Sequence, residues 1–151
     1  MTTNIALLLT IHLLSTAAMA GLIWFVQIVH YPLFDAVGEG QFISYEQQHT
    51  QLTGWVVGPF MAVEGITALA IAAIRPAGVS PVLLVAGLAL LAVIHASTVW
   101  LQVPAHGTLV EGFDPEVTSR LVATNWIRTV GWSGRALVAG AMILAATRQN
   151  I

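Results

Sequence analysis

The sequence contains no cysteine and no lysine, and its 151 residues include only five arginines. Without cysteine, the chain has no disulfides, thiolate-ligated metals, iron–sulfur clusters or cysteine nucleophiles. The formal net charge of −2 leaves no basic face, which proteins need in order to bind nucleic acid. We therefore expect no nucleic-acid partner, and any bound metal must be held by nitrogen and oxygen atoms.

Charged residues are also scarce. They make up 8% of the chain, whereas hydrophobic residues make up 57%; ordinary soluble proteins contain about 25% charged residues. Such a chain cannot cover itself with a solvated surface, so we predict an integral membrane protein whose first partner is the lipid bilayer. No linker, charge block or internal repeat divides the sequence, which indicates a single transmembrane domain over residues 1–151.

Four apolar segments are long enough to cross a bilayer as helices, which takes about 20 residues. They cover approximately residues 5–30, 52–74, 81–103 and 121–147. The predicted fold is all-α, an integral membrane four-helix bundle with both termini on the same side. Arginine bias between the connections weakly favours cytoplasmic termini. The acidic residues of the other side would then be extracytoplasmic; they are Asp35, Glu39, Glu46, Glu111, Asp114 and Glu116.

The fourth apolar segment carries polar residues along one face. Asn125, Arg128, Trp132 and Arg135 follow one another at spacings of three, four and three residues, which places them on one side of a helix. An arginine at the bilayer centre costs about 2.5–3.5 kcal/mol on insertion scales, so two of them require polar partners. Glu64 of the second segment should lie at a depth close to that of Arg135. We therefore expect this helix to face a polar pocket inside the bundle.

Polar residues of the other apolar segments, several of them histidines, are predicted to face the same pocket. His95, Gln102 and His106 form one stripe, and Gln27 and Tyr31 share a face of the first helix. We expect these groups to converge in the half of the bundle nearest the acidic connections. The candidate metal ligands are His30, His49, Glu64, His95 and His106. The candidate residues lining a cofactor or ligand cavity are Gln27, Tyr31, Gln102 and Trp132.

Imidazole and carboxylate groups of this kind suit zinc, copper or iron, and a mixture of the two with open coordination positions is typical of non-haem iron. Haem is a further alternative, through two axial histidines on different helices. The sequence has no H-E-x-x-H motif, which would indicate zinc, and no paired Glu-x-x-His motif of the di-iron type. The pattern therefore predicts a transition-metal site without selecting the metal.

A metal-free interpretation uses the same residues differently. Asn125, Arg128 and Arg135 would hold an anionic or carbonyl-bearing substrate, and His95 or Glu64 would act as the catalytic base. A structural interpretation also stands, in which Arg135 and Glu64 form an ion pair that only fixes helix packing. No hydrolase triad, phosphate-binding loop or dinucleotide fingerprint accompanies these residues.

Two stretches carry a family resemblance: "LQVPAHGTLVEGFDPEVTSRLVATNWIRTVGWSGR", residues 101–135, and "VQIVHYPLF", residues 26–34. They resemble a group of small four-helix bacterial membrane proteins of largely unknown role and, more distantly, the anthrone-oxygenase-like family. That likeness implies a site containing Asn125, Arg128 and Thr129, and oxygenation of an aromatic, hydrophobic substrate without flavin or nicotinamide. It also implies a bacterial inner membrane. This chain departs from the family by placing His106 where an Asn is usual.

Our leading hypothesis is an integral membrane oxidoreductase or oxygenase-like enzyme, with a site opening to the acidic side of the bundle. Asn125, Arg128 and Arg135 would orient the substrate or order the metal ligands. A lipid-soluble substrate such as a quinone or polyketide would enter sideways between helices. The alternative is a non-catalytic subunit or a ligand- or haem-binding module, whose polar network packs helices or docks a partner in a homo-oligomer or larger membrane complex.

Overall fold

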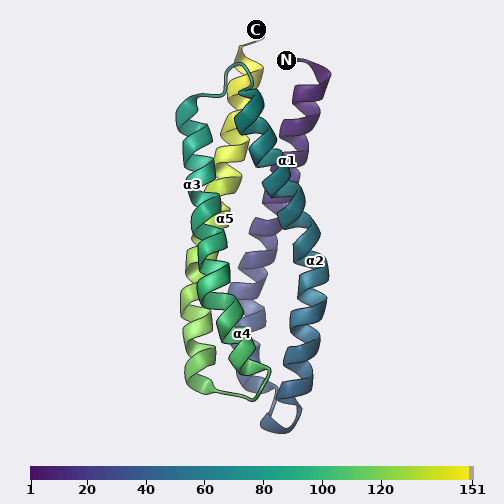
Figure 1. Ribbon diagram of the computed structural model, residues 1–151, viewed down its shortest axis with the longest axis vertical. Helices are drawn as coiled ribbons and strands as arrows, with labels where there is room; N and C mark the ends of the chain where they lie inside the picture. Colours follow the sequence, from purple (N-terminus) through teal and green to yellow (C-terminus); the bar gives the residue numbers. More distant parts are fainter. Residues whose placement is uncertain (150–151) are drawn as a thin grey trace.

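The computed structural model describes residues 1–149 and shows a bundle of four helical rods (Figure 1). Several rods are composed of more than one helical segment. The segments in chain order are α1 (Thr3–Phe25), η1 (Val26–His30), η2 (Tyr31–Ala36), α2 (Glu39–Ile74), α3 (Pro81–Ser97), η3 (Thr98–Gln102), α4 (Val103–Leu109) and α5 (Pro115–Arg148). Both described chain ends lie at the same end of the bundle, so the predicted all-α four-helix bundle is confirmed.

Short polar signals set the starts of two rods. The Asp114 side chain accepts hydrogen bonds from the backbone N–H groups of Glu116 and Val117, and Pro115 occupies the first position of α5. Ser80 caps α3 in the same way by accepting from the N–H of Leu83. A capping oxygen satisfies N–H groups that the first helical turn leaves free, and proline is tolerated there because it has no N–H to satisfy.

The rods are longer than the apolar segments from which they were predicted. The largest difference is at α2, which begins at Glu39, whereas the apolar segment begins near residue 52. Residues 39–51 are therefore helical and do not form a loop. A helix bonds its own backbone groups, so it can continue out of an apolar layer with polar side chains. This extension places Glu46 and His49 on a rigid helix that faces the other rods.

Two π-helical turns interrupt the rods, η1 in the first and η3 in the third. Each lies just before a proline, Pro32 or Pro104, whose ring clashes with the carbonyl four residues earlier. Those carbonyls belong to Ile28 and Trp100, which lie inside the two π turns. The wider turn relieves the clash, and the helix continues past the proline instead of ending there. Such π turns often occur at functional sites.

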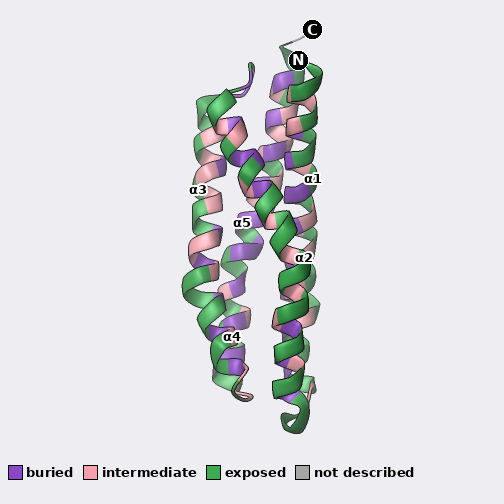
Figure 2. Ribbon diagram, turned by 45° about the vertical axis from the view of Figure 1, so that its right-hand side comes forward, coloured by how far each residue is buried: buried purple, intermediate pink, exposed green. Residues whose placement is uncertain are grey.

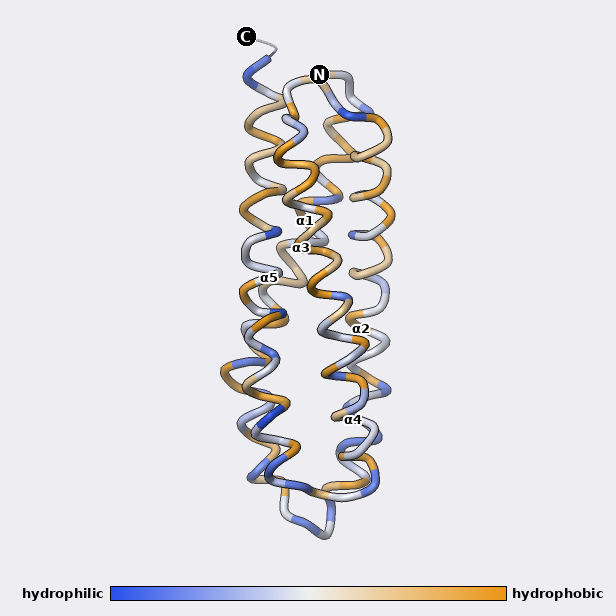
Figure 3. The backbone as a smooth tube through the Cα atoms, turned by 60° about the vertical axis from the view of Figure 1, so that its left-hand side comes forward, coloured by the Kyte–Doolittle hydropathy of each residue, from blue (hydrophilic) through white to orange (hydrophobic). Residues whose placement is uncertain are grey.

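The four rods are long and apolar enough to cross a membrane: residues 3–36, 39–74, 81–109 and 115–148. Helix α5 packs against α1 and α3, and α1 packs against α2, whereas α2 meets the α3–α4 rod only sparsely. Figure 1 shows α2 and α4 standing apart in the half of the bundle away from the termini. Hydrophilic residues are concentrated in this half (Figure 3). The seam between α2 and the α3–α4 rod is therefore a region of sparse helix contact.

Buried residues line the inner face of each rod, and exposed apolar residues cover the outside (Figure 2). Three apolar clusters follow one another along the bundle. The terminal cluster contains Leu9, Ile71, Val79, Met142 and Ala146; the middle cluster contains Met19, Ile23, Ile94 and Trp132; the loop cluster contains Tyr31, Phe34, Phe42, Ala105, Leu109, Val117 and Leu121. Polar side chains occupy the two levels between these clusters.

A close helix crossing joins α3 and α5 at the middle cluster. A Cβ atom added at Gly131 would lie 2.7 Å from a side-chain carbon of Ile94, so this contact requires a glycine. We expect Gly131→Ala to lower the free energy of unfolding by about 1–3 kcal/mol through overpacking. Gly140→Ala on the same helix is the control, because a Cβ there meets nothing within 4 Å. Reversible unfolding in mild detergent measures both; equal stability of the two variants would contradict the tight crossing.

Candidate metal centre

Three histidines and one carboxylate meet at the polar level between the middle and loop clusters. We call His30, Glu46, His49 and His106 the histidine cluster. His30 Nε2 lies 2.7 Å from His49 Nδ1, and Nδ1 of His106 is hydrogen-bonded to Oε1 of Glu46. The Tyr31 hydroxyl lies 3.0 Å from His106 Nε2. The cluster therefore connects the first, second and third rods.

Within this cluster, Glu46, His49 and His106 have the geometry of a metal-binding group. Each offers one ligand atom, and the three atoms lie within 4.8 Å of one another. Glu46 and His49 are buried and His106 is partly buried. In a zinc or iron site with bonds of about 2.0–2.2 Å, neighbouring ligand atoms lie roughly 3 Å apart. Small side-chain rotations would bring the three groups around one ion.

An unpartnered carboxylate oxygen supports this assignment. Glu46 is fully buried, and its Oε2 atom has no hydrogen-bond partner among residues 1–149. A buried acceptor left without a partner costs about 1–3 kcal/mol, and more when it is charged. A cation between Glu46 and the two imidazoles would remove this cost. Buried oxygen and nitrogen donors of this kind suit iron, zinc or copper.

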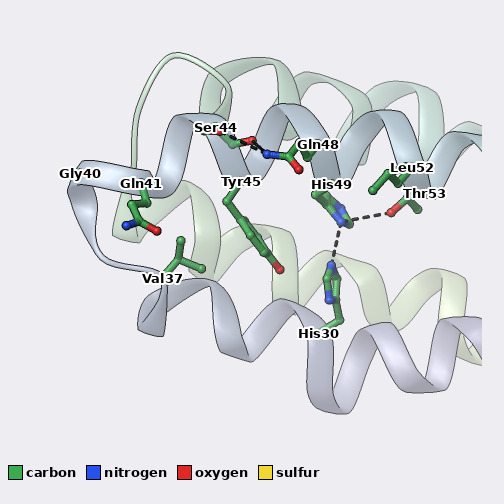
Figure 4. Close-up of a pocket in the computed structure, with 10 residues that line it drawn as sticks. All are labelled: His30, Val37, Gly40, Gln41, Ser44, Tyr45, Gln48, His49, Leu52 and Thr53. Carbon is green, nitrogen blue, oxygen red and sulfur yellow. Dashed lines mark hydrogen bonds between the residues drawn. The ribbon is translucent and has the colours of Figure 1, made fainter.

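His49 is hydrogen-bonded to groups that would orient its ring as a metal ligand. Its Nδ1 atom contacts His30 Nε2 and, at 3.1 Å, the hydroxyl of Thr53 one turn along α2 (Figure 4). Its other ring nitrogen has no hydrogen bond within the described chain. Metal-bound histidines characteristically use the second ring nitrogen for a hydrogen bond that fixes the orientation of the ring. The contacts of His49 match this pattern, with His30 and Thr53 as the orienting groups.

Two cavities adjoin the histidine cluster, and His49 lines both of them. The loop cavity, about 540 Å³, lies between η1 and the first turns of α2 and is lined by His30, Tyr45 and Gln48 among others (Figure 4). The lateral cavity, about 470 Å³, lies in the seam between α2 and the η3–α4 segment. His106 lines the lateral cavity as well. The cluster therefore lies between a cavity near the connections and a cavity that faces between helices.

The lateral cavity is mostly apolar and contains one arginine. Val57 and Met61 of α2 face Val103 and Val110 across it, and Arg128 of α5 lies at its wall. Tyr31 also lines it and lies close enough to Arg128 for electrostatic interaction with the guanidinium. An apolar pocket with a few converging polar groups is the usual form of a small-molecule site.

Gln27 and Asn125 form a separate contact between α1 and α5. The Gln27 Oε1 atom accepts hydrogen bonds from Asn125 Nδ2 at 2.9 Å and from the Thr129 hydroxyl at 3.3 Å. Gln27 Nε2 donates to the backbone carbonyl of Val122 at 3.1 Å. These groups are turned toward each other and line neither of the two cavities. Their visible role is to join the two helices beside the site.

A second polar group, the central network, lies between the middle and terminal clusters. Arg135 is ion-paired with Glu64, donates a hydrogen bond to the Gly87 carbonyl, and lies 3.4 Å from His12 Nε2. His12 Nδ1 lies 2.9 Å from the hydroxyl of Thr67. The cavity beside the network is only about 10 Å³. Apolar clusters close both sides of the network, so its geometry is that of a packing contact.

The structure divides the predicted metal-ligand pool between these two levels. His30, His49 and His106 come together in the histidine cluster, whereas Glu64 belongs to the central network. His95 lies near Glu64 and bonds the carbonyl of Leu91 on its own helix. Of the residues predicted to line a ligand cavity, Tyr31 and Gln102 line the lateral cavity. Trp132 is fully buried in the middle cluster instead.

Glu46 was missed as a candidate ligand, although the sequence carries a signal for it. Its position in a supposed loop suggested a solvated acid, but it is a buried residue of α2. Glu46 and His49 form a single Glu-x-x-His sequence, whose spacing places both side chains on one face of a helix. His12, which the sequence favours as a polar packing contact over a ligand, belongs to the central network.

Comparison of the chain with protein-family models, with curated proteins and with solved structures finds no match.

Proposed function

We propose that this chain is a metal-dependent integral membrane oxidoreductase that acts on a hydrophobic substrate. The observation that carries the proposal is the buried Glu46 carboxylate, which has an unpartnered oxygen and lies beside His49 and His106. Both histidines line an apolar cavity. The ligand set supplies the metal site, and the cavity supplies room for a substrate beside it. Glu46, His49 and His106 would bind the ion, and His30 and Thr53 would orient His49.

Iron is the metal that best fits an oxidoreductase with this donor set. Two histidines and one carboxylate with open positions are typical of non-haem iron(II) enzymes, whereas zinc with similar ligands supplies no redox chemistry. Copper also accepts imidazole ligands. Haem fits poorly. The ring centroid of His49 lies 4.5 Å from that of His30 and 5.2 Å from that of His106, and these distances leave no room for a porphyrin between the rings.

The resemblance to the anthrone-oxygenase-like family supports a hydrophobic substrate and a bacterial inner membrane. It covers the residues around Asn125 and Arg128, and Arg128 is the one that lines the lateral cavity. The charge bias of the connections supports an orientation in which the histidine cluster and the loop cavity lie toward the extracytoplasmic side. His106, which departs from the family pattern, is one of the proposed metal ligands.

The test is elemental analysis with an optical absorption spectrum, on protein purified in mild detergent without a histidine tag. We expect about one iron per chain, retained through gel filtration. Copper or zinc at the same ratio would preserve the site and change the chemistry. A metal-free protein that takes up none of these ions when they are added would contradict the proposal.

A second candidate is a non-catalytic membrane subunit, and the closed central network favours it. Arg135 and Glu64 satisfy each other with almost no adjacent cavity, so a large share of the buried charge serves packing. This candidate predicts a metal-free protein that leaves native membranes as part of a larger complex. Native mass measurement after extraction in mild detergent distinguishes the two: the enzyme should carry metal without another subunit, and the accessory subunit should do the reverse.

A further inference from the structure

Arg128 is a buried cation without a carboxylate. It is 8% exposed and forms no ion pair with any Asp or Glu in the described part of the chain, where its Nε atom also has no hydrogen-bond partner. Arg135 on the same helix is, by contrast, paired with Glu64. An unpaired guanidinium is costly in a membrane-spanning helix. Its neighbour Tyr31 interacts with it as a neutral polar group and does not balance the charge.

The cavity wall opposite Arg128 is kept open by glycine. Gly54 and Gly58 on α2 and Gly107 on α4 line the lateral cavity, and a Cβ atom added at any of them would meet nothing within 4 Å. Glycine inside a helix costs about 1 kcal/mol relative to alanine, so these residues oppose helix stability. The space they leave is apolar and large enough for a small molecule.

The cavity lies at a face of the bundle that carries exposed apolar side chains. It lies in the sparse seam between α2 and α4, which stand apart in this half of the bundle (Figure 1). Large apolar side chains near the seam face outward, among them Trp55 and Val56 on α2 and Val99 and Trp100 on η3. These residues are suited to contact with acyl chains. This arrangement suits a ligand that enters from the bilayer between α2 and α4.

We propose that the lateral cavity binds a lipid-soluble carboxylic acid, with its carboxylate on the guanidinium of Arg128 and its apolar chain along the glycine-lined wall of α2. Arginine matches a carboxylate with two parallel hydrogen bonds, which supplies the missing counter-charge. A phosphate headgroup carries more acceptors than this single cation can satisfy, since Arg128 is the one arginine that lines the cavity. The inference that this acid is the substrate rests on the proposed function. The inference that the cavity binds such an acid does not depend on it.

The experiment uses the full chain in phosphatidylcholine nanodiscs and two radiolabelled probes, dodecanoate and dodecan-1-ol. Bound probe is measured against empty nanodiscs, and the metal content of every preparation is measured in parallel. Arg128→Gln removes the charge, Gly58→Leu fills the cavity, and Gly65→Leu is the matched control on the same helix. Gly65 also has open space around its Cβ position but does not line the cavity.

We expect the chain to bind dodecanoate at least about tenfold more tightly than the alcohol, as a charge-assisted hydrogen bond predicts. Arg128→Gln should remove this preference, Gly58→Leu should weaken both probes, and Gly65→Leu should change neither. Equal binding of acid and alcohol, or displacement of dodecanoate by an equal concentration of phosphatidylglycerol, would overturn the inference. If metal-free protein binds the acid, the binding site is supported and the proposed metal-dependent function fails. If the protein contains metal but shows no preference for the acid, the binding site fails and the proposed function stands.

Discussion

Replacing Glu64 by leucine is expected to lower the free energy of unfolding by about 3–5 kcal/mol, whereas replacing Glu64 and Arg135 together should restore most of that loss. The single change leaves the guanidinium of Arg135 buried at 2% exposure without its carboxylate. The double change removes both charges and fills the space with apolar atoms. Breaking a buried pair is therefore worse than deleting it.

A double-mutant cycle in mild detergent measures this coupling. Arg135→Leu completes the cycle, and Glu111→Leu is the control, because Glu111 is exposed in the connection before α5 and should tolerate the change. The double variant should also keep the metal content of the parent, since the central network and the histidine cluster occupy different levels. Additive destabilisation by the two single changes would show that the pair is not coupled. Loss of metal in a stable double variant would show that the two levels act together.

The hydrophobic pattern was sufficient to predict the bundle, because bilayer thickness leaves few alternatives for four long apolar segments. It also placed Arg135 beside Glu64, since both lie near the middle of their segments and each requires a partner. The ends of the rods could not be predicted from hydropathy. Residues 39–51 are polar, and hydropathy does not distinguish a polar helix from a loop.

The composition of the site depended on those missing ends. With residues 39–51 taken as a loop, Glu46 had no defined direction; in α2 it points inward at one helical face with His49. The prediction for His95 was wrong in the opposite sense, because it included a residue that lies at the level of the central network. It was grouped with His106 by helical spacing, but the π turn η3 lies between them and adds a residue to the local turn. A π turn before a proline rotates the direction in which all later side chains of the rod point. Spacing counted at 3.6 residues per turn does not include that rotation.

The largest effect on the proposed activity is expected from Glu46→Gln. The amide keeps the size of the side chain but removes the negative charge that would bind the ion, so we expect metal affinity to fall by at least about 100-fold, beyond the loss typical of an outer-shell change. His106→Ala should match it. His30→Ala, which removes only a partner of His49, should lower affinity by about 10–100-fold.

Competition with a chelator of known affinity measures these changes, with circular dichroism confirming that each variant remains helical. Glu39→Gln is the matched control, because it removes an exposed carboxylate from the first turn of the same helix. The graded order distinguishes ligands from a surface charge effect: a diffuse effect would weaken binding similarly in Glu46→Gln and Glu39→Gln. If Glu46→Gln retained the affinity of the parent, the carboxylate would not be a ligand, and the two histidines alone would not support the proposed centre.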